Sequence, residues 1–223
     1  MAYYQMFIND SDCVKTARPL APEGIILHSV GCAQSRASVF IRQWNRPGCN
    51  VAPHAIIDGS GDIYQTLPYD LRGWHAGGRG NNTHIGIEMC EPSTLRYVNG
   101  YNFTVDAEDL PAALKLAERT YKAAVMLCRD LCVQYKLDPK SIISHAEAHA
   151  LGIASDHGDP DYYWHCLGTS YTMDGFREDV RAALDAGKEW KVEITSVLTK
   201  TDADQIVSSL LESGYDAIAY PVL

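Results

Sequence analysis

Short apolar segments, each closed by polar residues, recur along the chain and predict β-strands. Residues 24–29 (Gly-Ile-Ile-Leu-His-Ser) form a continuous apolar run, the pattern of a strand buried on both faces. Two apolar runs within 51–67 flank the Gly- and Asp-rich stretch 58–62 and predict a hairpin. Residues 84–90 alternate between apolar and polar positions and predict another strand, and 141–145 predict a further one.

Two longer segments carry apolar residues at steps of three and four and therefore predict amphipathic helices. The first covers 110–135 and is expected to end before Asp138 and Pro139, and the second covers 174–186. Strands interspersed with such helices predict an α/β fold, in which a mixed central sheet carries helices on its faces.

The C-terminal part of the chain has a pattern of its own. We expect two domains, 1–187 and 192–223. The second would contain strands at 192–195 and 216–220 around a helix at 202–213. A βαβ unit of about 32 residues is too small to bury a core alone.

Composition places the chain among ordinary globular proteins. Of its 223 residues, 46% are hydrophobic and 21% charged, and no apolar run approaches the roughly 20 residues of a membrane span. A formal net charge of −9 speaks against a nucleic-acid partner. The first ten residues carry no Lys or Arg, so we expect no signal peptide. The protein would then be made in the cytoplasm and released by another route.

Seven cysteines, an odd and irregularly spaced set, indicate mostly buried thiols rather than a disulfide framework. Cys128 and Cys132 lie four residues apart on an apolar helix face and are expected to be core thiols. Cys32 and Cys49 flank a loop, and the sequence leaves open whether they pair in an oxidising exterior.

Two of the eight histidines, His28 and His145, close predicted strands. A rigid strand fixes an imidazole while its end opens onto loops, which suits a catalytic zinc site with three protein ligands and one open position. The third ligand is expected in the loop after His145. Composition does not choose among its four candidates, which are Glu147, His149, His157 and Asp159.

Six regions of the chain carry a resemblance to a known family, in that family's order. They are Gly24–Ser29, Val51–Gly59, Tyr64–Pro68, Arg72–Gly78, Asn81–Glu88, and Ile143–Glu147 together with Ser155–Pro160. In these regions the chain resembles the zinc-dependent N-acetylmuramoyl-L-alanine amidases of type 2, which are related to the peptidoglycan recognition proteins. Three further segments, 7–13, 152–157 and 172–180, resemble in particular the amidase endolysins of phages and prophages of Gram-positive anaerobes.

The resemblance implies one zinc ion held by His28, His145 and Asp159, because the family's third ligand is a Cys or Asp directly before a proline. It implies that Glu88 is the general base for the zinc-bound water. His157 stands where the family often has a lysine that stabilises the oxyanion, and we expect it to take that role.

Some members of the family carry a catalytic tyrosine directly before the residue that matches His54, but this chain has Pro53 there. An aromatic face and amide donors suit sugars and a stem peptide, so we expect substrate contacts from His54, Trp74, His75, Asn81 and Asn82. The alternative for the loop at 77–82 is a plain flexible connection. For His54 and His75 a structural role is the alternative, and we do not expect either to catalyse.

The implied activity is hydrolysis of the amide between the lactyl group of N-acetylmuramic acid and L-alanine in peptidoglycan, by a bacteriolytic endolysin released with the help of a holin. The runner-up is a wall-binding module of the same fold without activity, which would have no reason to keep the ligands and Glu88. A more distant alternative is a zinc carboxypeptidase or deacetylase. Its expected His-x-x-Glu spacing is absent from His145-Ala-Glu147-Ala-His149.

Residues 192–223 resemble the first half of the repeat in small wall-binding domains of the SPOR kind. Half of such a domain leaves a sheet edge unpaired. We therefore expect this segment to bind glycan and either to pair with a second copy, giving a homo-oligomer, or to belong to a longer chain.

Overall fold

The computed structural model describes residues 1–100, 102–186 and 199–213. Contacts within the chain divide it into two compact units, Met1–Gly187 and Lys188–Leu223. In the second unit the described element is the helix α7 (Lys200–Glu212), where the sequence predicts a helix. The two strands expected around α7, at 192–195 and 216–220, lie outside the described residues, so the βαβ interpretation stays a prediction.

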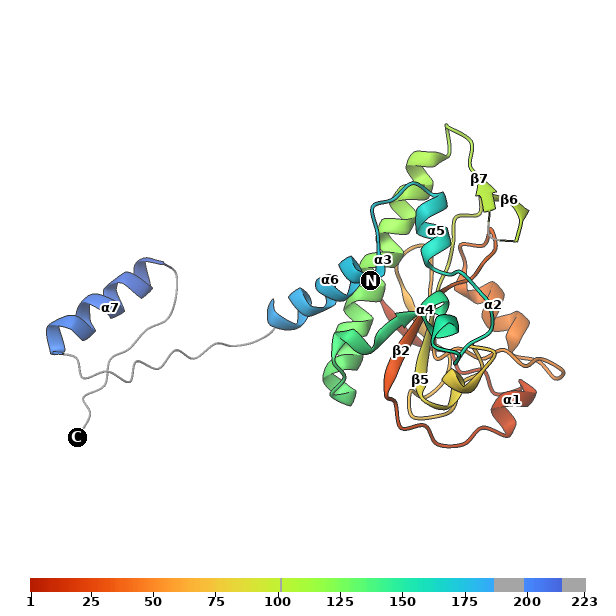
Figure 1. Ribbon diagram of the computed structural model, residues 1–223, viewed down its shortest axis with the longest axis horizontal. Coiled ribbons are helices and arrows are strands. Elements are labelled where there is room, and N and C mark those ends of the chain that lie inside the picture. Colours follow the sequence, from red (N-terminus) through yellow and green to blue (C-terminus); the bar gives the residue numbers. More distant parts are fainter. Residues whose placement is uncertain (101, 187–198, 214–223) are drawn as a thin grey trace. The chain divides into compact units, whose positions relative to one another are not determined.

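A six-stranded sheet forms the centre of the first unit (Figure 1). Across the sheet its strands are β1 (Tyr3–Gln5), β4 (Ile63–Gln65), β3 (Ala55–Ile57), β5 (His84–Met89), β2 (Gly24–Ser29) and β8 (Ile142–Ser144). Neighbouring strands are parallel except β3 and β4, which form the predicted antiparallel hairpin. This mixed sheet with flanking helices confirms the predicted α/β fold class.

The remaining elements of this unit are helices and one small hairpin. They are α1 (Asp12–Lys15), α2 (Ala37–Trp44), η1 (Arg79–Asn82), β6 (Arg96–Asn99), β7 (Asn102–Thr104), α3 (Leu110–Tyr135), η2 (Pro139–Ser141), α4 (His145–Ala150), α5 (Asp161–Cys166) and α6 (Met173–Ala186). The two long helices match the periodicity of the sequence closely. None of the helices in the described ranges is long and apolar enough to cross a membrane.

Alternation along β2 separates the two faces of the sheet. Ile25 and Leu27 belong to the main core, which includes the apolar face of α3. Ile26 lies on the other face, in a separate cluster with residues of α4 and of the loop before η1. His28 follows Ile26 by two residues and therefore shares its face, and the parallel register places Glu88 of β5 beside it. The sheet thus holds His28 and Glu88 together, opposite α3.

His145 does not end a strand, as the apolar pattern suggested, but is the first residue of α4. Ser144 caps this helix: its Oγ accepts a hydrogen bond from the Glu147 amide (3.1 Å), and the Glu147 carboxylate accepts one from the Ser144 amide (2.9 Å). This is the Ser-x-x-Glu capping box, which is readable in a sequence. Because β8 stops one residue earlier, His145 still lies at the end of the sheet.

The cysteines are all free thiols, and four of the seven are buried. Cys128 and Cys132 lie in the main core along α3, as predicted. Cys32 and Cys49 are not bonded to each other.

Candidate functional site

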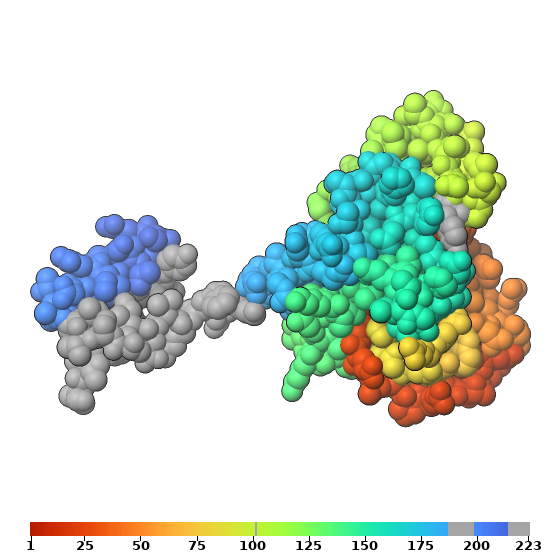
Figure 2. Space-filling model, viewed as in Figure 1, coloured from red at the N-terminus to blue at the C-terminus, as the bar shows by residue number. Residues whose placement is uncertain are grey.

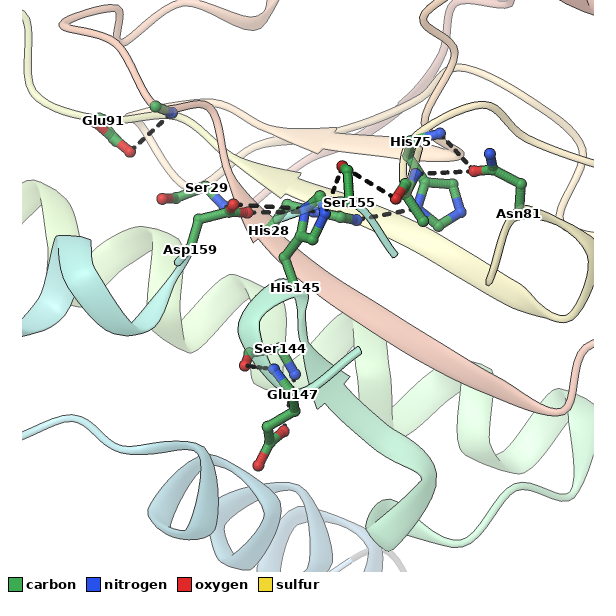
Figure 3. Close-up of polar contacts among 12 residues, drawn as sticks. His28, Ser29, His75, Asn81, Glu91, Ser144, His145, Glu147, Ser155 and Asp159 are labelled. Atoms are coloured by element: carbon green, nitrogen blue, oxygen red, sulfur yellow. Dashed lines mark hydrogen bonds and ion pairs between the residues drawn. The ribbon is translucent and has the colours of Figure 1, made fainter. Parts of the chain in front are cut away.

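Three side chains from separate elements converge at the end of the sheet (Figure 3). His28 Nδ1 lies 3.0 Å from His145 Nδ1 and 3.2 Å from Asp159 Oδ2, and His145 Nδ1 lies 3.5 Å from Asp159 Oδ1. Donor atoms placed about 2 Å from one ion in a tetrahedral arrangement are about 3.3 Å apart. Within the described ranges, this group of side chains is the one whose donor atoms are spaced to hold a metal ion.

Backbone hydrogen bonds bring Asp159 to the two histidines. Its carbonyl oxygen accepts a hydrogen bond from the His145 amide (3.0 Å), and its carboxylate accepts one from the Ser29 amide (3.2 Å). The loop before α5 is therefore tied both to α4 and to the end of β2.

The other three candidates for the third ligand do not belong to this group of donor atoms. Glu147 forms a bidentate ion pair with Arg177, at 3.0 and 3.1 Å. His149 is exposed, and its Nε2 lies 3.7 Å from an Asp156 carboxylate oxygen. His157 is also exposed and packs its ring on that of His145, with ring centroids 4.7 Å apart. Asp159 is the candidate that the fold brings to His28 and His145.

Carboxylates give this cluster a field that favours a cation. Burial acts to lower the pKa of His28, but the nearby Glu88 and Asp159 carboxylates outweigh it and raise that pKa. Burial and the neighbouring His28 lower the pKa of His145 to about 4, so its imidazole is neutral at neutral pH. Burial opposes ionisation of Asp159, but its contacts with the two histidines lower its pKa on balance.

Glu88 carries an unsatisfied oxygen atom beside the three metal-binding groups. Its Oε2 is buried and accepts no hydrogen bond from the described residues. Burial raises the pKa of Glu88 to about 7, although the neighbouring His28 acts to lower it. A buried carboxylate oxygen without a partner is costly and therefore calls for an explanation. A carboxyl group that titrates near neutral pH is suited to proton transfer.

Five imidazole rings form a row through the site, in the order His54, His75, His28, His145 and His157. Successive ring centroids are 5.6, 5.1, 4.7 and 4.7 Å apart, and each pair meets edge to face. The row begins in the interior, where His54 is 0% exposed, and ends at the surface with His157.

Two of the expected substrate contacts are enclosed in the fold. His54 accepts a hydrogen bond at Nδ1 from the Gly86 amide (2.9 Å) and donates from Nε2 to the Leu71 carbonyl (2.8 Å). Asn81, 2% exposed, accepts at Oδ1 from the amides of His75 and Ala76, both at 2.8 Å. Neither side chain offers surface to a substrate. The structure therefore corrects the expectation for both, and His54 takes the structural alternative.

Trp74, His75 and Asn82 keep some exposed surface. The Arg72 guanidinium lies 3.5 Å from the centroid of the Trp74 ring and donates from Nε to Asn82 Oδ1 (2.6 Å). The segment around η1 lies against the segment that follows α4 (Figure 2), and Gly80 donates its amide hydrogen to the Ile153 carbonyl at 2.8 Å. For these three residues substrate contact stays a prediction.

Sequence reasoning missed two polar residues beside the site. Ser155 Oγ lies 3.3 Å from His145 Nε2 and 3.4 Å from the Ala76 carbonyl, to which it donates. Glu91 is 0% exposed and accepts hydrogen bonds from the Gly31 amide (3.0 Å) and the Tyr97 hydroxyl, and burial raises its pKa to about 7. Glu91 follows Glu88 by three residues at the end of a predicted strand, a spacing that could have suggested it.

Comparisons with known sequences agree with this geometry. Residues 18–162 match the protein family described as N-acetylmuramoyl-L-alanine amidase. The chain is 35% identical over 91 residues to the N-acetylmuramoyl-L-alanine amidase CwlH of Bacillus subtilis (strain 168). The aligned segment covers 38% of this chain and 36% of CwlH. It is 41% identical over 58 residues to the amidase XlyA of the same organism, and this segment covers 25% of this chain and 19% of XlyA. The chain thus spans about a third or less of these relatives.

Solved structures share the fold. The catalytic domain of XlyA aligns with a TM-score of 0.56 at 21% identity, over 81% of this chain and 99% of that one. The Staphylococcus aureus hydrolase AmiA in complex with its ligand aligns with a TM-score of 0.59 at 19% identity, over 82% and 83% of the two chains.

The enclosure of His54 predicts a pH-dependent contribution to stability. Burial lowers its pKa from 6.5 to about 4 in the folded protein, so protonation favours the unfolded chain. The stabilising contribution is present above pH 6.5 and is lost as the pH falls toward 4. Between pH 7 and pH 4.5 we expect the free energy of unfolding of the wild type to fall by about 2 to 3 kcal/mol more than that of His54→Gln.

Urea unfolding of both proteins at the two pH values measures this difference. His149→Ala, which removes an exposed imidazole, should follow the wild type. A gap between wild type and His54→Gln that does not change with pH would contradict the structural role.

Proposed function

Because the chain belongs to the N-acetylmuramoyl-L-alanine amidase family, we propose that its first unit hydrolyses the amide between the lactyl group of N-acetylmuramic acid and L-alanine in peptidoglycan. The observation that carries this proposal is the convergence of His28, His145 and Asp159 beside Glu88, whose Oε2 is buried. Three metal-binding groups with a proton acceptor next to them are the parts that metal-assisted amide hydrolysis needs.

Zinc is the ion that suits this donor set. Two imidazole nitrogens and one carboxylate are a usual set for catalytic zinc, and three protein ligands leave one position open. Donor spacings of 3.0, 3.2 and 3.5 Å agree with one small ion bound by His28, His145 and Asp159. When bound, zinc would polarise the scissile carbonyl and lower the pKa of water from about 15.7 toward about 7.

Glu88 is the proposed general base. It lies beside His28 in the strand register, and its Oε2, which has no hydrogen-bond partner among the described residues, is available to a proton. The carboxylate would take a proton from the attacking water and deliver it to the leaving amine of L-alanine. A pKa of about 7 favours transfer in both directions at neutral pH.

His157 is the proposed donor to the substrate oxyanion. Its exposed ring packs on His145 at the surface end of the row, where substrate would approach. An N–H group there would stabilise the carbonyl oxygen as that atom gains charge. Trp74, His75 and Asn82 are the proposed substrate contacts. Arg72 covers one face of the Trp74 ring, so a sugar would meet the part of this side chain that stays exposed.

The finer biological assignment follows from the sequence segments that resemble phage amidases. We propose an endolysin that lyses Gram-positive bacteria, is made in the cytoplasm and reaches the wall after holin action. Residues 192–223 would bind the wall, as half of a SPOR-like domain that pairs with a second copy.

Removal of any one of the three metal-binding groups should empty the site. We expect His28→Ala, His145→Ala and Asp159→Ala each to lose most of the bound zinc, because two remaining donors hold the ion weakly. Elemental analysis after dialysis measures the zinc content, and His149→Ala should keep one ion per chain. Full occupancy in Asp159→Ala would instead assign the third ligand to His157.

The reaction itself is tested on purified peptidoglycan. We expect new free L-alanine amino termini in the released fragments, their loss after chelation and their return with added zinc. Mass spectrometry of the fragments identifies the bond that is cut. Fragments cut within the stem peptide or the glycan would contradict the proposed activity.

Glu88→Gln should retain zinc and lose turnover by about 10²- to 10⁴-fold, because an amide cannot take the proton of water. Glu91→Gln is the matched control, since Glu91 is also buried and also has a pKa of about 7. We expect it to keep most of the turnover. Measurement of zinc content and of kcat on a soluble muramoyl-peptide separates the two effects. Near-normal turnover of Glu88→Gln would rule out the general-base role.

Deletion of residues 192–223 should spare cleavage of a soluble muramoyl-peptide and weaken binding to intact walls. The first unit contains the whole of the candidate site, so its chemistry should not need the tail. Co-sedimentation with purified walls measures binding, and size-exclusion chromatography measures any loss of self-association. If activity on the small substrate disappears as well, the proposed domain boundary is incorrect.

A further inference from the structure

The two ring nitrogens of His28 face different surroundings (Figure 3). Nδ1 faces His145 and Asp159, whereas Nε2 lies 2.9 Å from Nδ1 of His75. On its far side, His75 Nε2 lies 3.1 Å from the carbonyl oxygen of His84. A short chain of hydrogen bonds therefore runs from the metal-binding cluster through His75 to the backbone of β5.

The backbone carbonyl sets the direction of this chain. A carbonyl oxygen can only accept, so Nε2 of His75 carries a hydrogen. A neutral imidazole carries one hydrogen, which leaves His75 Nδ1 as an acceptor. The donor to it is then the N–H group at Nε2 of His28. A cationic His75, which would reverse this order, is disfavoured because its ring lies between the imidazoles of His28 and His54 with little exposure to water.

We propose that His75 is a positioning residue of the metal centre, which keeps the hydrogen of His28 on Nε2 and so directs the lone pair of Nδ1 at the ion. This role rests on the proposed function, because it concerns the same metal site. Hydrogen bonds that fix the tautomer of a metal-binding histidine typically change metal affinity by about 10- to 100-fold when removed.

The fold holds the His75 ring from several sides. A Cβ atom at residue 86 would lie 2.2 Å from Cγ of His75, so only glycine leaves room for the ring on β5. The His75 amide donates to the buried Oδ1 of Asn81, at 2.8 Å. His54 packs on the ring, and its own Nδ1 accepts from the Gly86 amide. These contacts fix His75 independently of substrate.

Two variants separate the hydrogen bond from packing. His75→Asn keeps an acceptor oxygen near the position of Nδ1, and His75→Leu removes the acceptor at similar bulk. Competition with a zinc-chelating dye measures the zinc dissociation constant of the full chain. We expect about 10- to 100-fold weaker binding for His75→Leu and substantial recovery for His75→Asn. His149→Ala is the control and should bind zinc like the wild type.

Nuclear magnetic resonance of the metal-free wild type, with ¹⁵N-labelled histidine and at a pH where the imidazoles are neutral, needs no variant. We expect the His75 hydrogen on Nε2, which leaves its Nδ1 to accept the hydrogen bond from His28 Nε2. The tautomer of His28 is not the criterion in the metal-free protein, because the Asp159 carboxylate, 3.2 Å from its Nδ1, also favours a hydrogen there. A hydrogen on Nδ1 of His75 would overturn the proposal, as would an unchanged zinc affinity in a folded His75→Leu. If the wild type binds no zinc, the proposed function fails, but this measurement still decides the tautomer of His75.

Discussion

The parallel register of β2 and β5 is the constraint on which the site depends. Side chains alternate between the faces of a strand, so a slip of one residue would move His28 into the core beneath α3. Ile25 and Leu27 pack in that core, and every residue of β2 is buried. Hydrophobic burial on one face of the sheet therefore fixes the position of His28 and Glu88 on the other.

Burial also supplies the chemistry. In a site of low dielectric constant, a carboxylate binds a proton more tightly and attracts a cation more strongly than in water. Asp159 receives backbone support from the Ser29 amide, whereas Glu88 Oε2 accepts no hydrogen bond from the described residues. The same strand ends thus hold one carboxylate that is stabilised as an anion and one that is poised to exchange a proton.

Much of the fold could be predicted because its central elements carry long patterns. The 26 residues of α3 repeat at helical spacing, and β2 reads as an uninterrupted apolar run. Strands of three residues, such as β1 and β7, are too short to show a period. His145 was misplaced because the apolar run before it resembles a strand up to its last residue, although the capping box of α4 marked the change.

The site could be predicted only in part because residue type does not reveal whether the fold buries a side chain or brings it to the site. Asp159 stands 131 positions from His28, and only tertiary contacts distinguish it from Glu147, His149 and His157. The same holds for the imidazole of His54 and the amide of Asn81, which suit substrate contact but are enclosed in the fold.

What orders the five imidazoles is the partner that each ring nitrogen meets. His54 has backbone groups at both nitrogens, so it can only support the fold. His75 has a backbone carbonyl at one nitrogen and the His28 imidazole at the other, so the backbone fixes the position of the hydrogen on both rings. The two inner rings are thus held by backbone groups, whereas His28 and His145 each turn one nitrogen toward the cluster. The row therefore changes from structure to function as it approaches the surface.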